Sequence, residues 1–230
     1  MATKHGENLI KMTRMGAFSA YLVREEDGFT LVDTGLPGSA NSFLKTADDE
    51  GLPINRVTLT HAHDDHTGSL DQIAGLVPDA EYLWTARTAQ FLSGDVSMME
   101  NEAQAELKVT SSVRSTKATQ IIQAGDKVGS LEVIASPGHT PDHIAFFDTR
   151  DGTLIAGDAF VTVGKPAVTG IFRWYFPFPT MATWHVPTGI ESAEKLLALK
   201  PSRLAVGHGK VVENPADVMQ AAIEEAKRKM

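Results

Sequence analysis

The chain has 230 residues, of which 42% are hydrophobic and 22% charged, and this composition is that of a globular protein long enough to bury a large core. The formal net charge of −8 provides no basic surface for nucleic acid, and the absence of cysteine excludes disulfides and thiolate metal ligands. No apolar run approaches the roughly 20 residues of a membrane-spanning helix. We therefore expect a cytoplasmic protein without nucleic-acid or membrane partners. Because no Pro/Gly/Ser-rich linker divides the chain, we also expect one domain over residues 1–230.

The first half of the chain alternates strand-like and helix-like segments. Residues 20–23 and 29–32 predict a hairpin whose second strand ends at Asp33. The later segments follow in chain order: a helix over 40–50, a strand over 56–59, a helix over 69–76, a strand over 81–84 and a helix over 86–92. This rhythm is typical of a layered α/β arrangement.

The second half begins with its least regular part, residues 94–119, where we expect a helix and then a mobile loop, with a lid as one candidate role. Strands are predicted over 120–122, 131–135, 144–147, 153–155 and 203–206. Two helices have start signals: a capping box of Thr188 and Glu191 for a helix through 199, and Asn214-Pro215 as N-cap and first residue of the last helix.

The most informative segment is His61-Ala62-His63-Asp64-Asp65-His66, which directly follows the apolar run 57–60. Residues two apart in an extended segment point the same way, so His61 and His63 can converge on one metal while Asp65 and His66 turn toward a second. Three later candidate ligands, His139, Asp158 and His208, each lie beside a glycine after an apolar run. Imidazole and carboxylate donors suit zinc, with iron and manganese as alternatives.

The HxHxDH run at 61–66, followed by His139, Asp158 and His208 and preceded by Val32-Asp33-Thr34-Gly35, resembles the metallo-β-lactamase superfamily over residues 18–209. The resemblance implies an α/β (α+β) fold, an αββα sandwich of two mixed β-sheets flanked by helices. It also implies two divalent metal ions. His61, His63 and His139 would hold the first, Asp65, His66 and His208 the second, and Asp158 would bridge them.

This site predicts a hydrolase in which a hydroxide between the metals attacks a carbonyl carbon, with Asp65 as the catalytic group that accepts or delivers a proton. Asp158 resembles the thioesterase, lactonase and esterase branches, because β-lactamase members generally lack an aspartate there. Only 22 residues follow His208, whereas glyoxalase II has a helical C-terminal extension. We therefore expect a lactone or carboxylic ester as substrate. The alternatives are a glyoxalase II-like thioester and, in another class, the sulfur dioxygenase branch with a single iron.

Two polar residues near the motifs have open roles. Asp33 is either a turn former or, as the resemblance implies, the hydrogen-bond partner of a ligand histidine. His143 lies where the family often has a Gly-His motif, but Asp142 replaces the glycine, so a structural role and a role behind the ligands both stay open.

Residues 172–185 are rich in aromatic side chains, and Pro177 and Pro179 predict a loop there. Three interpretations remain: a wall against the apolar portion of a small-molecule substrate, the interface of a homodimer, and a plug over the sheet. If Tyr175 points inward, its hydroxyl would support the oxyanion, which makes Tyr175 the second catalytic candidate.

Overall fold

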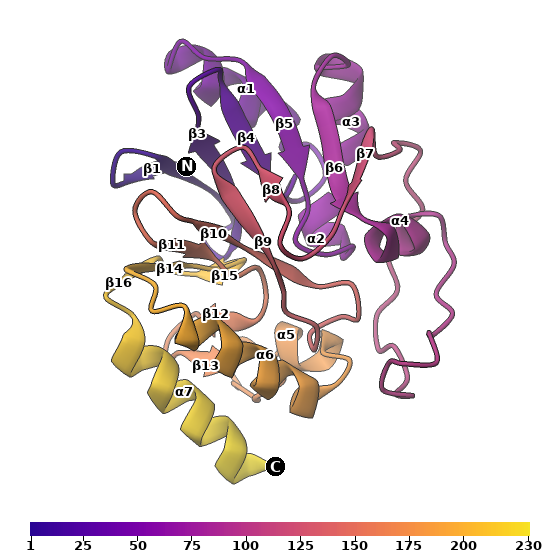
Figure 1. Ribbon diagram of the computed structural model, residues 1–230, viewed down its shortest axis with the longest axis vertical. Helices are drawn as coiled ribbons and strands as arrows, with labels where there is room; N and C mark the ends of the chain where they lie inside the picture. The colour runs from indigo at the N-terminus through magenta and orange to yellow at the C-terminus, as the bar shows by residue number, and fades with distance from the viewer.

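Two mixed β-sheets form the middle of the molecule and helices cover both outer faces, in the computed structural model that describes residues 1–230 (Figure 1). The first sheet has the strand order β13-β12-β15-β3-β4-β5-β6-β7, with β2 beside β3 and β1 beside β2. Its strands are β1 (Ala2–His5), β2 (Leu9–Arg14), β3 (Phe18–Arg24), β4 (Phe29–Val32), β5 (Ile54–Thr58), β6 (Glu81–Thr85), β7 (Gln120–Ile122), β12 (Phe160–Thr162), β13 (Ala167–Val168) and β15 (His208–Gly209).

The second sheet has the order β16-β14-β11-β10-β9-β8. Its strands are β8 (Lys127–Val128), β9 (Leu131–Ala135), β10 (Ile144–Asp148), β11 (Thr153–Ile155), β14 (Arg203–Ala205) and β16 (Val212–Glu213). The helices are α1 (Ala40–Asp49), α2 (Asp64–Thr67), α3 (Leu70–Leu76), α4 (Ala86–Leu92), α5 (Phe178–Ala182), α6 (Val186–Ala198) and α7 (Ala216–Lys229). None of them is long and apolar enough to cross a membrane.

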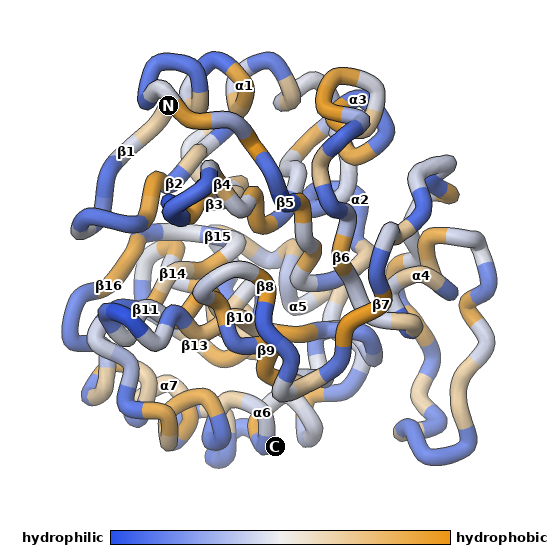
Figure 2. Tube along the Cα trace, turned by 45° about the horizontal axis from the view of Figure 1, so that its top comes forward, coloured by the Kyte–Doolittle hydropathy of each residue, from blue (hydrophilic) through white to orange (hydrophobic).

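The core consists of three apolar layers. One layer packs the first sheet against α1 and α3, with Leu31 and Phe43 among its members. The second lies between the sheets, where Tyr21 of β3 and Phe146 of β10 are buried, and the third packs the second sheet against α6 and α7. Figure 2 shows hydrophobic strand segments in the middle of the molecule and hydrophilic turns at its periphery. The predicted αββα sandwich of two mixed sheets is confirmed.

Several predicted element boundaries differ from the structure for local reasons. Helix α6 begins at Val186 with His185 as its N-cap, whose side chain accepts a hydrogen bond from the Thr188 N–H, so the predicted Thr188–Glu191 capping box is wrong. Helix α7 begins one residue later than predicted, at Ala216, because Asn214 has a left-handed backbone (φ +48°) and Pro215 is the N-cap. The loop predicted at Pro177 and Pro179 is wrong over the short helix α5, because both prolines lie at its start, where a backbone N–H has no partner within the helix.

Residues 94–119 contain no helix and form an irregular excursion beside α4 (Figure 1). The excursion is fixed at both ends by side-chain hydrogen bonds. Near its start Arg87 pairs with Glu102, and near its end Arg114 pairs with Asp64 at 2.6 Å. The helix predicted at the start of this segment is therefore wrong, because polar side chains order the backbone in place of helical hydrogen bonds.

Candidate metal centre

The predicted ligands lie in loops, in helix α2 and at the first residue of strand β15. His61 and His63 follow β5, and α2 then carries Asp65 and His66. His139 lies between β9 and β10, Asp158 between β11 and β12, and His208 begins β15. The fold thus gathers side chains that are up to 147 residues apart in the sequence, and all seven predicted ligands meet in one cluster, in which Asp65 alone is partly exposed.

The first triad comprises His61, His63 and His139. His63 Nδ1 lies 3.1 Å from His61 Nε2 and 3.0 Å from His139 Nε2. Burial lowers the pKa of His63 to about 4 and holds the pKa of the other two rings well below their usual range, so all three are neutral at pH 7. Tetrahedral zinc with ligands at about 2.0–2.1 Å would separate its ligand nitrogens by about 3.3 Å. The three nitrogens therefore fit a metal ion at their centre.

The second triad comprises Asp65, His66 and His208. His208 Nε2 lies 3.2 Å from Asp65 Oδ2, and His66 Nε2 lies 3.7 Å from the same oxygen. Burial lowers the pKa of His208, but Asp158 and Asp65 outweigh it and raise the pKa to about 9. This half of the cluster therefore favours positive charge, which a divalent cation would provide.

Asp158 lies between the two triads. Its Oδ2 is 3.4 Å from His139 Nε2 and 3.0 Å from His208 Nε2, while its Oδ1 is 3.3 Å from His66 Nε2. Asp158 Oδ1 and His66 Nε2 are buried and form no hydrogen bond. Because an unpartnered buried polar atom is costly, these atoms indicate a missing partner of the kind that a metal ion supplies.

Asp33 holds a ligand of the second triad in place. Its Oδ2 lies 2.8 Å from His66 Nδ1, and its Oδ1 accepts a 2.7 Å hydrogen bond from the Thr60 N–H. The residue has a left-handed backbone (φ +64°), a conformation that aspartate adopts more readily than most residues. The structure therefore shows Asp33 as the hydrogen-bond partner of His66, and the role of His66 as a metal ligand stays a prediction.

Three threonines that the sequence analysis missed contact the ligand histidines. Thr60 Oγ1 lies 3.0 Å from His61 Nδ1, and the hydroxyls of Thr169 and Thr183 lie 2.9 and 3.2 Å from His139 Nδ1. Such contacts fix the tautomer and orientation of a ligand ring. Only Thr60 had a signal in the sequence, its place directly before His61, because the other two reach the site through the fold.

His143 lies behind the ligands. Its Nε2 accepts a 3.0 Å hydrogen bond from the backbone N–H of Asp158, and its Nδ1 lies 3.0 Å from the Ser136 carbonyl oxygen. Burial lowers the pKa of His143 to about 4, so the ring is neutral and can accept this bond. His143 therefore positions the backbone that carries Asp158.

The structure does not bring Tyr175 to the cluster. Its hydroxyl accepts a 3.0 Å hydrogen bond from the Lys165 N–H, and its ring packs against Gly164. Tyr175 does not line the cavity that opens over the cluster. The condition for its catalytic role, an inward-pointing hydroxyl, is therefore not met, because the turn at Gly164 and Lys165 holds the ring.

A cavity of about 330 Å³, the metal pocket, opens over the cluster. Five of the predicted ligands line it, namely His63, Asp65, His139, Asp158 and His208. Most of the other lining side chains are apolar, namely Phe18, Leu36, Pro37, Val109, Phe178, Pro179 and Ala182. The aromatic segment and the excursion thus both reach the pocket, the first through α5 and the second through Val109.

The aromatic segment divides into three parts. Phe178 and Pro179 line the metal pocket, as a substrate wall would. Phe176 and Trp184 are buried, and the ring of Phe176 lies 5.3 Å from that of His208. Phe172 and Trp174 are 60% and 80% exposed, and the prediction of a homodimer through this segment stays a prediction.

Comparisons with known proteins agree with this geometry. The family model described as the metallo-beta-lactamase superfamily matches residues 16–208. The chain is 44% identical over 212 residues to the uncharacterized protein YobT of Bacillus subtilis (strain 168), covering 91% of each chain. It is 30% identical over 207 residues to the probable metallo-hydrolase YflN of the same organism, covering 82% of this chain and 78% of the relative.

Among solved structures, the di-iron-bound form of TTHA1623 superposes with a TM-score of 0.66 at 22% identity, covering 89% of this chain and 94% of the other. At this identity the likeness supports the fold alone.

Proposed function

Because the chain belongs to the metallo-β-lactamase superfamily, we propose that it is a binuclear metal-dependent hydrolase that cleaves a lactone or a carboxylic ester. The observation that carries the proposal is the pair of triads with Asp158 between them. The first triad, the second triad and Asp158 would hold two divalent ions, with zinc as the first candidate and iron or manganese as alternatives. Such ions supply Lewis acidity for a carbonyl oxygen and lower the pKa of water toward neutrality.

Asp65 is the residue we assign to proton transfer. Its side chain is 26% exposed, whereas that of Asp158 is only 2% exposed, and Asp65 lines the metal pocket. Burial would raise the pKa of Asp65, but His66 and His208 outweigh it and hold the pKa well below its usual range. Asp65 is therefore a carboxylate at neutral pH. Because this carboxylate lines the pocket, we assign to it the transfer of a proton from the nucleophile to the leaving group.

The apolar side of the pocket favours a substrate with an apolar portion. Phe178 and Pro179 line the same pocket as the predicted ligands, so an acyl or aryl group could pack there while its carbonyl faces the cluster. The burial of this portion would exclude water and orient the carbonyl.

The test is hydrolysis by the metal-loaded protein of a panel of lactones, aryl esters and thioesters, before and after chelation. We expect turnover of lactones or esters, its loss on chelation, and its return with zinc or another divalent ion. Turnover confined to thioesters would favour the glyoxalase II-like alternative. Oxygen uptake with a persulfide and no hydrolysis would replace the proposal by the sulfur dioxygenase alternative.

A further inference from the structure

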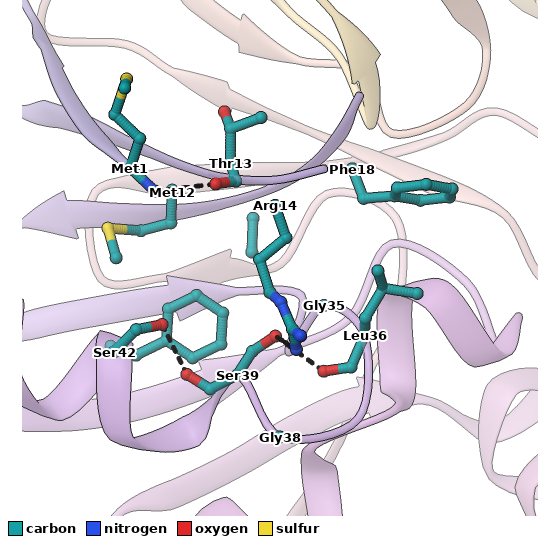
Figure 3. A pocket seen from close by; sticks show the side chains of 12 residues that line it. Met1, Met12, Thr13, Arg14, Phe18, Gly35, Leu36, Gly38, Ser39 and Ser42 are labelled. Carbon is teal, nitrogen blue, oxygen red and sulfur yellow. Dashed lines mark hydrogen bonds between the residues drawn. The ribbon is translucent and has the colours of Figure 1, made fainter. Parts of the chain in front are cut away.

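A second cavity, of about 260 Å³, adjoins the metal pocket (Figure 3). Phe18 and Leu36 line both cavities, so these two side chains form the boundary between them. The second cavity lies between the β2–β3 hairpin and the loop that joins β4 to α1. A substrate arm that leaves the metal pocket past Phe18 and Leu36 would enter it.

The lining of this cavity has two chemical parts. Met12, Ala20 and Phe43 contribute apolar surface, and all three are buried. Arg14 and Ser39 contribute polar groups, and Figure 3 shows the Arg14 side chain extending from the strand toward the loop that carries Ser39. The cavity therefore offers both apolar surface and a cation to a ligand that enters it.

The Arg14 guanidinium has an unused pair of donors. Its Nη1 donates to the Pro37 carbonyl oxygen at 2.7 Å and to Ser39 Oγ at 3.1 Å, and both acceptors are neutral. Arg14 is an exposed residue, and its Nε and Nη2 form no hydrogen bond within the protein. This edge of a guanidinium matches the two oxygens of a carboxylate.

The lack of an acidic partner sets Arg14 apart in this chain. Seven of the nine arginines form ion pairs with carboxylates, and the two exceptions are Arg14 and Arg228. Arg228 lies in the last turn of α7 and lines neither the metal pocket nor the second cavity. In a chain with 29 acidic residues, Arg14 is thus the one unpaired arginine that lines either of these two cavities.

We propose that the second cavity binds a carboxylate at the far end of the substrate. The preferred substrates would be esters in which an apolar chain separates the scissile carbonyl from a second, ionised carboxylate, which Arg14 binds in a bidentate manner. This inference rests on the proposed function and adds to it a substrate class.

The experiment compares two series of 4-nitrophenyl esters on the metal-loaded protein: monoesters of dicarboxylic acids and esters of monocarboxylic acids of equal chain length. For chains long enough to reach Arg14, we expect kcat/KM to be about 10- to 100-fold higher for the acid-ended ester, mainly through KM. Arg14→Gln should bring this ratio close to one. Arg228→Gln removes the same charge outside the cavity and should keep the ratio.

Ser42→Phe provides a second variant that leaves the charge of Arg14 in place. Ser42 is an exposed residue of α1 that lines the cavity, so a phenyl ring there should fill the cavity and also abolish the preference. Equal kcat/KM for the two series in the wild type would overturn the proposal, as would an unchanged ratio in Arg14→Gln.

If neither series is hydrolysed, the ester part of the proposed function fails, and binding then decides the cavity separately. The ligand for calorimetry is the 4-nitrophenyl ether of equal chain length, which keeps the terminal carboxylate and lacks the scissile carbonyl. It should bind the wild type about 10- to 100-fold more tightly than Arg14→Gln. Equal binding by the two proteins would overturn the carboxylate site.

Discussion

Gly207→Ala is expected to abolish metal binding at the second triad. A Cβ atom at this position would lie 2.2 Å from Asp158 Oδ1 and 2.6 Å from His66 Cε1, whereas ordinary van der Waals contact begins at 3.4 Å. Asp158 Oδ1 would have to move by about 1.2 Å, the difference between 3.4 and 2.2 Å. Metal sites tolerate ligand displacements of only about 0.2 Å.

The size of the effect follows from this displacement. Loss of a hydrogen bond behind a ligand typically lowers metal affinity by about 10- to 100-fold, and moving two ligands is more severe. We therefore expect metal affinity at the second triad and kcat/KM to fall by at least about 100-fold.

The assay is metal content per chain together with turnover, after the fold has been checked by circular dichroism. Gly75→Ala is the matched control, because Gly75 has no neighbour within 4 Å of a Cβ atom and lies in helix α3. It should keep both metals and full turnover. A folded Gly207→Ala protein with two metals per chain and wild-type turnover would refute the assignment of Asp158 and His66 as ligands.

Three further predictions follow from single contacts. The double variant Thr169→Val, Thr183→Val removes both hydroxyls beside His139 Nδ1, so metal affinity at the first triad should fall about 10- to 100-fold in a chelator competition. An unchanged affinity would show that the hydroxyls do not orient the ring. Tyr175→Phe should keep the wild-type kcat, because the Tyr175 hydroxyl accepts a hydrogen bond from the Lys165 N–H outside the metal pocket. A kcat lowered tenfold or more, with the metals retained, would restore Tyr175 as an oxyanion donor. Hydrogen bonds from Arg173, Lys165 and Lys229 hold the pKa of Glu225 well below its ordinary value of 4.5. The stability that Glu225 contributes is therefore present above pH 4.5, and it is lost as the pH falls through the lower pKa of the folded state. Glu225→Gln should therefore lower the melting temperature by roughly 2–8 °C at pH 7 and by less at pH 3, and an equal loss at both pH values would contradict the ion-pair explanation.

The cluster of candidate ligands was predictable because its residue types and their spacing are visible in short segments of the sequence. Five of the six residues from His61 to His66 carry atoms that can bind a metal ion, and His139, Asp158 and His208 each lie beside a glycine. Gly207 shows why a glycine is needed there, since any side chain would occupy the space of Asp158 and His66. The layered fold was predictable from the alternation of strand and helix patterns.

The contacts that orient the ligands were not predictable in the same way. Thr169 and Thr183 reach His139 across 30 and 44 residues of sequence, and nothing in their neighbours marks them. The β1–β2 pair was missed because exposed positions in β1 lack the alternating pattern of a half-buried strand. The second cavity also arises only from folding, since Arg14 and Phe43 meet through the packing of the β2–β3 hairpin against α1.

The most direct test of the account is the metal content per chain of the wild type and of two single variants, His139→Ala in the first triad and His208→Ala in the second. The account predicts two metal ions per chain in the wild type and one in each variant. A single ion in the wild type, or a metal content unchanged in either variant, would contradict the binuclear site.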